Sequence, residues 1–284
     1  LITQPINVTY LTGFSGEASN LIVSSGRVVL VSDGRFSEQI AEECPGLETI
    51  IRSPNQLTSE ATIAQLQTLG VRNVGFESGH LTVADFQGYS DGMKTANWKG
   101  AADRVEKLRR IKDADEVAQI RDAIRMSERA FGMFRAMLRE GDTELELTAA
   151  LEHYIRRSGG SGPAFPSIVA VGPRSALPHA PPSEARVGES PVLLVDWGAQ
   201  GRFYKSDLTR VLWVHNNVAM TQDRVPTDKV RAVHAVVKEA QRRAIAPMTP
   251  GPKKKAGGAA ARSALAEAGF GGYFSPWPGR RFRV

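Results

Sequence analysis

The chain has 284 residues, of which 42% are apolar and 23% are charged. These fractions are typical of globular proteins and argue against a disordered or fibrous chain, and the length predicts one large domain or two ordinary ones. No run approaches the ~18 uninterrupted apolar residues of a membrane-spanning helix, and no basic segment precedes an apolar core at the N-terminus, so we expect neither membrane insertion nor a secretory signal. The lone Cys44 cannot form an internal disulfide, which fits a cytoplasmic protein.

The net charge of +6 is concentrated near the end of the sequence. The segment 253–284 holds seven cations and one anion, whereas residues 1–252 hold equal numbers of each. A short basic run at a terminus is more often a solvated tail than a nucleic-acid surface, so we expect no nucleic-acid partner.

The first hundred residues alternate short strands with helices, which is typical of a small α/β domain. Apolar runs at 21–23 and 28–31 flank a glycine turn and predict a β-hairpin. The segment 58–69 has apolar residues at helical spacing, and 71–76 predicts a further strand. The periodicity then lapses, and we place the end of this domain near residue 103.

Two capped helices open the second domain. Asp113 with Glu116, and Thr143 with Glu146, have the spacing of capping boxes ahead of amphipathic segments. After these helices the pattern changes to short apolar strands and then returns to helix. In chain order we predict a strand at 168–171, an antiparallel hairpin formed by 191–196 and 203–214, and helices at 227–246 and 258–268.

Two aspartates lie on the predicted hairpin. Asp196 follows four apolar residues, and a carboxylate at the end of a buried strand is costly unless it is paired or bound to a metal. A turn near Gly198–Gly201 brings Asp207 of the returning strand toward it, and a divalent cation would relieve the repulsion between the two carboxylates. A turn cap at Asp196 and an ion pair of Asp207 with Lys205 or Arg210 would explain the same residues without a metal.

His179 lies in a proline-rich loop just before this hairpin. A lone loop histidine is usually a surface residue, but it can bind substrate or transfer a proton if the loop closes over the carboxylates. The remaining histidines and Cys44 show no ligand spacing. The sequence contains neither a Gly-x-Ser-x-Gly nucleophile elbow nor a phosphate-binding P-loop, so serine hydrolases and P-loop enzymes are not indicated.

Five motifs, in chain order, resemble those of the Xaa-Pro aminopeptidase and dipeptidase family, which shares the pita-bread fold with methionine aminopeptidase and creatinase. They are NVTYLTGF at 7–14, SDGRF at 32–36, LRRIKDADE at 108–116, FPSIVAVG at 165–172 with Pro178-His179, and DWGA at 196–199 with YKSDLTR at 204–210. The resemblance implies an α/β, creatinase-like N-terminal domain at 1–103, whose start is clipped. It also implies an α+β pita-bread catalytic domain at 104–284, incomplete at its C-terminal end.

The resemblance also implies an activity, a cofactor and a substrate. The family hydrolyses the Xaa-Pro bond at the N-terminus of peptides, so short peptides with proline at the second position are the expected partners, for an aminopeptidase or a dipeptidase. Two divalent ions, most often manganese with cobalt or zinc as alternatives, would bind Asp196 and Asp207 among five protein ligands. His179 would contact the substrate, and the chain could form a homodimer.

The sequence departs from the family near its end. A His-Gly-x-Gly-His-Gly motif is expected just after Phe274, where the chain reads SPWPGRR, and no glutamate follows Glu267. Because three of five ligands are missing, we expect the chain to be impaired. One alternative is a non-catalytic pita-bread module that binds peptides or proteins, and another is a creatinase-like hydrolase that works without metal. The retained aspartates count against both.

Overall fold

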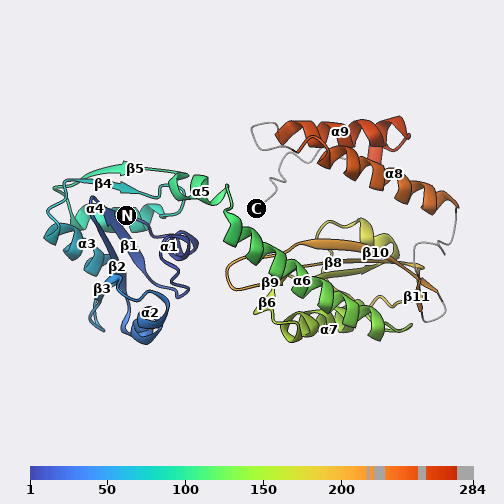
Figure 1. Ribbon diagram of the computed structural model, residues 1–284, viewed down its shortest axis with the longest axis horizontal. Coiled ribbons are helices and arrows are strands. Elements are labelled where there is room, and N and C mark those ends of the chain that lie inside the picture. The colour runs from blue at the N-terminus through green and yellow to red at the C-terminus, as the bar shows by residue number, and fades with distance from the viewer. Residues whose placement is uncertain (216–217, 221–227, 249–253, 274–284) are drawn as a thin grey trace. The chain divides into compact units, whose positions relative to one another are not determined.

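A computed structural model describes residues 1–215, 218–220, 228–248 and 254–273. The chain divides into two compact units, Leu1–Lys112 and Asp113–Val284 (Figure 1). The sequence places the boundary just before helix α5 (Arg104–Arg109). Because the Asn7 side-chain amide donates to Glu106 of α5 at 2.7 Å, we assign this helix to the first unit.

The first unit is built around a three-stranded sheet in the order β1-β2-β3. Strands β1 (Asn20–Ser24) and β2 (Arg27–Ser32) form the predicted antiparallel hairpin, and β3 (Glu48–Ile51) pairs with β2 in parallel. A separate parallel pair joins β4 (Asn73–Phe76) to β5 (Asn97–Gly100). The other elements are helices α1 (Pro5–Thr12), α2 (Ser37–Glu43), α3 (Thr58–Thr68) and α4 (Val83–Gly92) and the 3-10 turn η1 (Gly34–Phe36).

From Val29 onward, the central strand β2 is buried on both faces. Val29 and Val31 pack with residues of α3, whereas Leu30, which points to the opposite face, packs with residues of α1 and α2. Successive side chains of a strand point to opposite faces, so helices on both sides of the sheet give two separate apolar clusters.

Asp33 ties the end of β2 to two arginines. Its carboxylate accepts hydrogen bonds from the side-chain Nε and the backbone N of Arg35, both at 2.9 Å, and pairs with Arg52. The side-chain bond from Arg35, followed by the backbone bond, lowers the pKa of Asp33 to about 2. Because this value lies below the unfolded pKa of about 3.9, the stabilisation is fully present above about pH 4 and is lost as the pH falls toward the folded pKa.

We therefore expect the melting temperature of the wild-type chain to fall more steeply below about pH 4 than that of Asp33→Asn, whose amide does not titrate. Circular dichroism melts at a series of pH values measure this difference. Asp91→Asn, at an exposed position of the same unit, should keep the wild-type slope. Parallel curves for the wild type and Asp33→Asn would contradict the linkage.

The second unit contains an antiparallel sheet in the order β11-β10-β8-β7 and a small strand pair, β6 with β9. Both predicted capping boxes are confirmed, at the starts of α6 and α7. The helices are α6 (Ala114–Met137), α7 (Glu144–Arg157), α8 (Asp228–Ile245) and α9 (Lys254–Glu267), with 3-10 turns η2 (Gly172–Ala176) and η4 (Gly271–Tyr273). The strands are β6 (Gly162–Pro163), β7 (Ile168–Val171), β8 (Val192–Trp197), β9 (Ala199–Gln200), β10 (Leu208–His215) and β11 (Val218–Met220).

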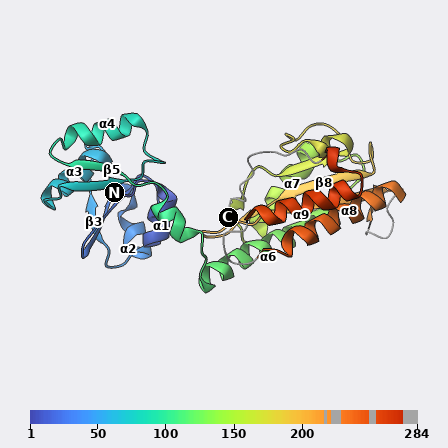
Figure 2. The ribbon, with the colours of Figure 1, turned by 90° about the horizontal axis from the view of Figure 1, so that it is seen from above.

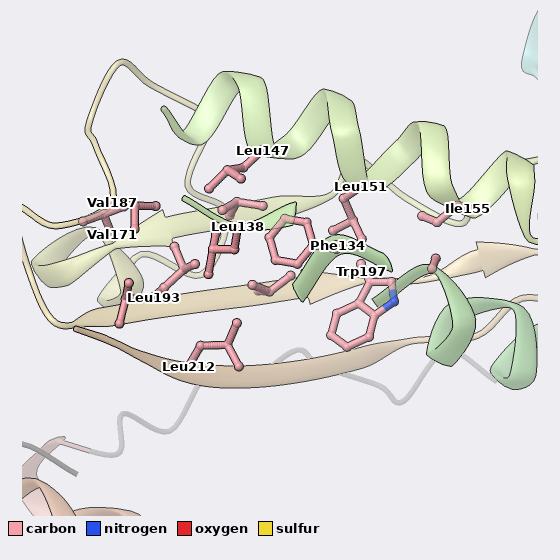
Figure 3. Close-up of a cluster of buried hydrophobic side chains, with 14 of the residues drawn as sticks. Phe134, Leu138, Leu147, Leu151, Ile155, Val171, Val187, Leu193, Trp197 and Leu212 are labelled. Atoms are coloured by element: carbon pink, nitrogen blue, oxygen red, sulfur yellow. The ribbon is translucent and has the colours of Figure 1, made fainter. Parts of the chain in front are cut away.

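Helices α6 and α7 cover one face of this sheet. Phe134 of α6 and Leu151 of α7 point into the same cluster as Leu193 and Trp197 of β8 and Leu212 of β10 (Figure 3). All five are buried. This cluster is the core of the second unit, and it fixes which face of β8 is turned toward the helices.

Helices α8 and α9 pack side by side and share a small apolar cluster (Figure 2). The sequence predicts that the second of them starts at residue 258, but α9 begins at Lys254. A Cβ atom at Gly257 would lie 2.6 Å from the Ala244 carbonyl oxygen, so this glycine permits a close contact between the two helices. In the parts of the chain that the structure describes, none of the helices has the length and apolar composition of a membrane span.

Candidate metal site

The predicted hairpin is confirmed, but its turn lies further along the chain than expected. The backbone N of Gly201 donates to the Tyr204 carbonyl at 2.9 Å, which closes a turn with Arg202 and Phe203 at its tip. Ala199–Gln200, placed in the turn by the sequence, instead forms β9 and pairs with β6. The predicted turn position is therefore wrong because these residues find a strand partner far away in the sequence.

The register of the hairpin places the two candidate aspartates. Asp196 lies opposite Thr209, and the bridge between Gln200 and Lys205 continues the same register beyond the end of β8. Asp207 therefore lies opposite Gly198. Alternate residues of a strand share a face, so Asp196 and Asp207 are diagonal neighbours on one face of the hairpin, at a separation of about 7–8 Å.

This face points away from α6 and α7. The neighbours of Asp196 in the strand, Val195 and Trp197, are buried in the core on the helix side. Asp196 itself is half-buried on the other face, and Asp207 is exposed. The strand that looks fully apolar in sequence thus places its carboxylate outside the core, where a charge is tolerated.

Gly198 allows the two strands to approach closely between the aspartates. A Cβ atom at this position would lie 1.9 Å from the Ser206 carbonyl oxygen, so no other residue fits without moving the backbone.

The orientation of Asp196 is set by a hydrogen bond across the hairpin. The hydroxyl of Thr209 donates to Asp196 Oδ1 at 2.9 Å. Asp196 lies within β8, so the alternative that it caps a turn is wrong. Lys205 donates to the Ala164 carbonyl and Arg210 to that of Thr209, and within the described part of the chain neither cation forms an ion pair with Asp207.

The hairpin is attached to α6 by a buried serine that the sequence pattern does not single out. The Ser206 hydroxyl lies 2.7 Å from the Ser127 hydroxyl and donates to the Ala123 carbonyl at 3.0 Å, while the backbone N of Ala199 donates to it at 3.0 Å. Because Ser206 precedes Asp207 directly, these contacts fix the backbone that carries the aspartate. The sequence feature that points to Ser206 is a polar residue at a position of the hairpin that faces the core.

The loop that contains His179 packs on the face that carries Asp196. His179 is exposed, but the next residue, Ala180, is buried against Ile168 and Ala170 of β7. Ile168 lies opposite Asp196 in the sheet. The structure therefore attaches the histidine loop beside the strand position of Asp196.

The donor chemistry of this face fits a hard divalent cation, because carboxylate oxygens are the ligands that such ions prefer. Within the described residues, no group of three or more His, Cys, Asp and Glu side chains could hold a metal. The positions after Phe274, where the resemblance leads us to expect a ligand motif, read SPWPGRR instead and lie outside the residues that the structure describes. Asp196 and Asp207 thus fit a metal as part of a ligand set.

Comparisons with known proteins agree with this arrangement. A creatinase/prolidase N-terminal domain model matches residues 1–111, and a model of metallopeptidase family M24 matches 118–277. The uncharacterized peptidase YqhT of Bacillus subtilis is 31% identical over 274 residues, covering 96% of this chain and 74% of that protein.

Solved structures resemble both parts of the chain. The X-Pro aminopeptidase from Thermotoga maritima matches with a TM-score of 0.85 and 30% identity, over 95% of this chain and 74% of that one. The Xaa-Pro dipeptidase from Bacillus anthracis matches with a TM-score of 0.86 and 29% identity, over 96% of this chain and 74% of that one. The predicted fold class, an α/β creatinase-like domain followed by an α+β pita-bread domain, is confirmed. The chain belongs to metallopeptidase family M24.

Proposed function

We propose that this chain carries a site for hydrolysis of the Xaa-Pro peptide bond at the N-terminus of short peptides, as an aminopeptidase or a dipeptidase, and that its turnover is impaired by the missing ligands. The observation that supports a peptidase site most directly is the common face of Asp196 and Asp207, beside the loop that contains His179. The substrate class is supported by relatives described as an X-Pro aminopeptidase and an Xaa-Pro dipeptidase.

In this proposal Asp196 and Asp207 supply oxygen ligands to two divalent ions, with manganese as the first candidate and cobalt or zinc as alternatives. Such ions, when bound, polarise the scissile carbonyl and compensate the negative charge that develops on its oxygen. Thr209 holds Asp196 in one orientation. Gly198 lets the two strands approach closely between the aspartates, and Ser206 fixes the backbone at Asp207.

His179 has a separate role in this proposal. Its imidazole lies on a loop attached to the face that carries Asp196. There it binds the substrate next to the scissile bond or donates a proton to the departing imino nitrogen of proline. Family members are called metallopeptidases, so a creatinase-like reaction without metal is the less favoured alternative. A non-catalytic peptide-binding module is the other.

The expectation that the chain is impaired concerns residues from Ser275 onward, which lie outside the described residues. It therefore stays a prediction, as do the homodimer and the identity of the metal. Measured turnover of the chain tests the impairment directly.

Hydrolysis of an Xaa-Pro dipeptide and of an Xaa-Pro-Xaa tripeptide, with added manganese, tests the proposed function. We expect slow cleavage that EDTA abolishes and fresh manganese restores, because the ions supply the charge that polarises the carbonyl. The same peptides with alanine in place of proline serve as the specificity control. Cleavage that survives EDTA would support the metal-free hydrolase, and peptide binding without cleavage would support the non-catalytic module.

A further inference from the structure

One buried carboxylate joins both ends of the loop that contains His179. Glu144 is the first residue of α7, and its side chain is fully buried. The loop leaves the sheet after Val171 and returns toward α7 at Ser183, and Glu144 contacts both residues. Neither the metal site nor the capping box of α7 explains a buried charge at this position.

Every neighbour that contacts the Glu144 carboxylate does so as a hydrogen-bond donor. Oε1 accepts from the backbone N of Val171 at 2.8 Å and from Arg174 Nε at 3.0 Å. Oε2 accepts from Arg174 Nε at 2.9 Å, from the backbone N of Ser183 at 3.0 Å and from the Ser183 hydroxyl at 2.7 Å. An ionised carboxylate can only accept hydrogen bonds and therefore suits these donors. The side-chain amide of a glutamine would place its own N–H groups against at least one of them.

Arg174 links Glu144 to the residues that follow His179. Its Nη2 donates to the Pro181 carbonyl at 2.5 Å, across the loop. Ala180, between His179 and Pro181, is buried against β7. Arg174 therefore fixes Pro181, and the sheet fixes Ala180. Both residues follow His179 directly and lie in the loop whose two ends contact Glu144.

We propose that Glu144 is a positioning residue, which holds the loop so that His179 stands on the face of the sheet that carries Asp196. Glu144 does not reach the reacting atoms and acts through Arg174 and Ser183. The inference rests on the proposed function, in which His179 contacts the substrate. Loss of Glu144 should therefore affect the reaction only through the histidine.

Hydrogen–deuterium exchange tests the structural part of this proposal. In Glu144→Gln we expect the backbone amides of Val171 and Ser183, which donate to Glu144, and of Leu177, which donates to the Arg174 carbonyl, to exchange about 10- to 100-fold faster. The reason is that hydrogen bonds to a buried charge are lost. The amides of β8 should keep their rates. Glu146→Gln is the matched control, since Glu146 caps the same helix through Thr143 and does not contact the loop. Unchanged loop exchange in Glu144→Gln would overturn the proposal.

A double-mutant cycle tests the functional part. If Glu144 acts through His179, kcat/KM of the double variant Glu144→Gln/His179→Ala should equal that of His179→Ala alone. Losses that multiply would show a general structural role and overturn the assignment. If Glu144→Gln does not fold, Ser183→Ala removes a single donor and should show a smaller rise in loop exchange. If the wild type cleaves no Xaa-Pro peptide, the proposed function fails, and the exchange experiment alone decides whether Glu144 holds the loop.

Discussion

Replacing Asp207 by Asn is expected to abolish the rise in melting temperature that manganese causes in the wild-type chain. A ligand that binds only the folded state stabilises it by RT ln(1 + [L]/Kd), which is about 2.7 kcal/mol at a concentration of 100 Kd. The amide of Asn provides one neutral oxygen in place of a carboxylate, on the face shared with Asp196. Thermal melts over a series of manganese concentrations measure the difference.

The stability of the metal-free variant distinguishes a ligand from a structural residue. Asp207 is exposed and is a diagonal neighbour of Asp196, so removing its charge reduces repulsion between the carboxylates. We expect metal-free Asp207→Asn to be at least as stable as the wild type. Asp122→Asn, which breaks an exposed pair with Arg125 on α6, should retain the manganese response.

The Asp207→Asn substitution should also reduce hydrolysis. Ions that stabilise the transition state by several kcal/mol imply a loss of at least about 100-fold in kcat/KM for Asp207→Asn. Conversely, a variant that keeps the full manganese response but loses stability without metal would assign Asp207 a structural role and would remove the main support for the proposed site.

Features set by local sequence could be predicted. The capping boxes at Asp113 and Thr143 follow from spacing over four residues, and the hairpin follows from two apolar runs joined by a short connection. The shared face of Asp196 and Asp207 depends on strand alternation and on the register, and the sequence correctly identified the hairpin that supplies both.

Features set by distant contacts could not be predicted. The turn position depends on β6, which draws residues 199–200 into a strand. Ser206 and Glu144 look like ordinary polar residues until α6 and the histidine loop pack against them. Glu144 in particular has the sequence signature of a helix N-terminus, where an acidic residue needs no further explanation. Only the fold shows that its charge is buried and shared among donors from two other segments.

Trp197→Ala is expected to be the most destabilising single change in the second unit, by about 3–5 kcal/mol. Trp197 is 1% exposed, its ring stacks on Phe131 with the centroids 4.3 Å apart, and its Nε1 donates to the Ser127 carbonyl at 3.0 Å. Removal of the ring leaves a cavity between β8 and α6 that the packed neighbours cannot fill. Urea denaturation followed by circular dichroism measures the loss.

Two further variants separate the contributions of the ring and of its polar group. Trp197→Phe keeps most of the aromatic packing and loses the indole donor, so we expect a smaller loss, with a retained manganese response because Asp196 and Asp207 are unchanged. Tyr273→Ala removes an aromatic ring that is 88% exposed and should change stability by less than about 0.5 kcal/mol. If Trp197→Ala were no more destabilising than Tyr273→Ala, the cluster between α6, α7 and the sheet would not be the core that holds Asp196 in place.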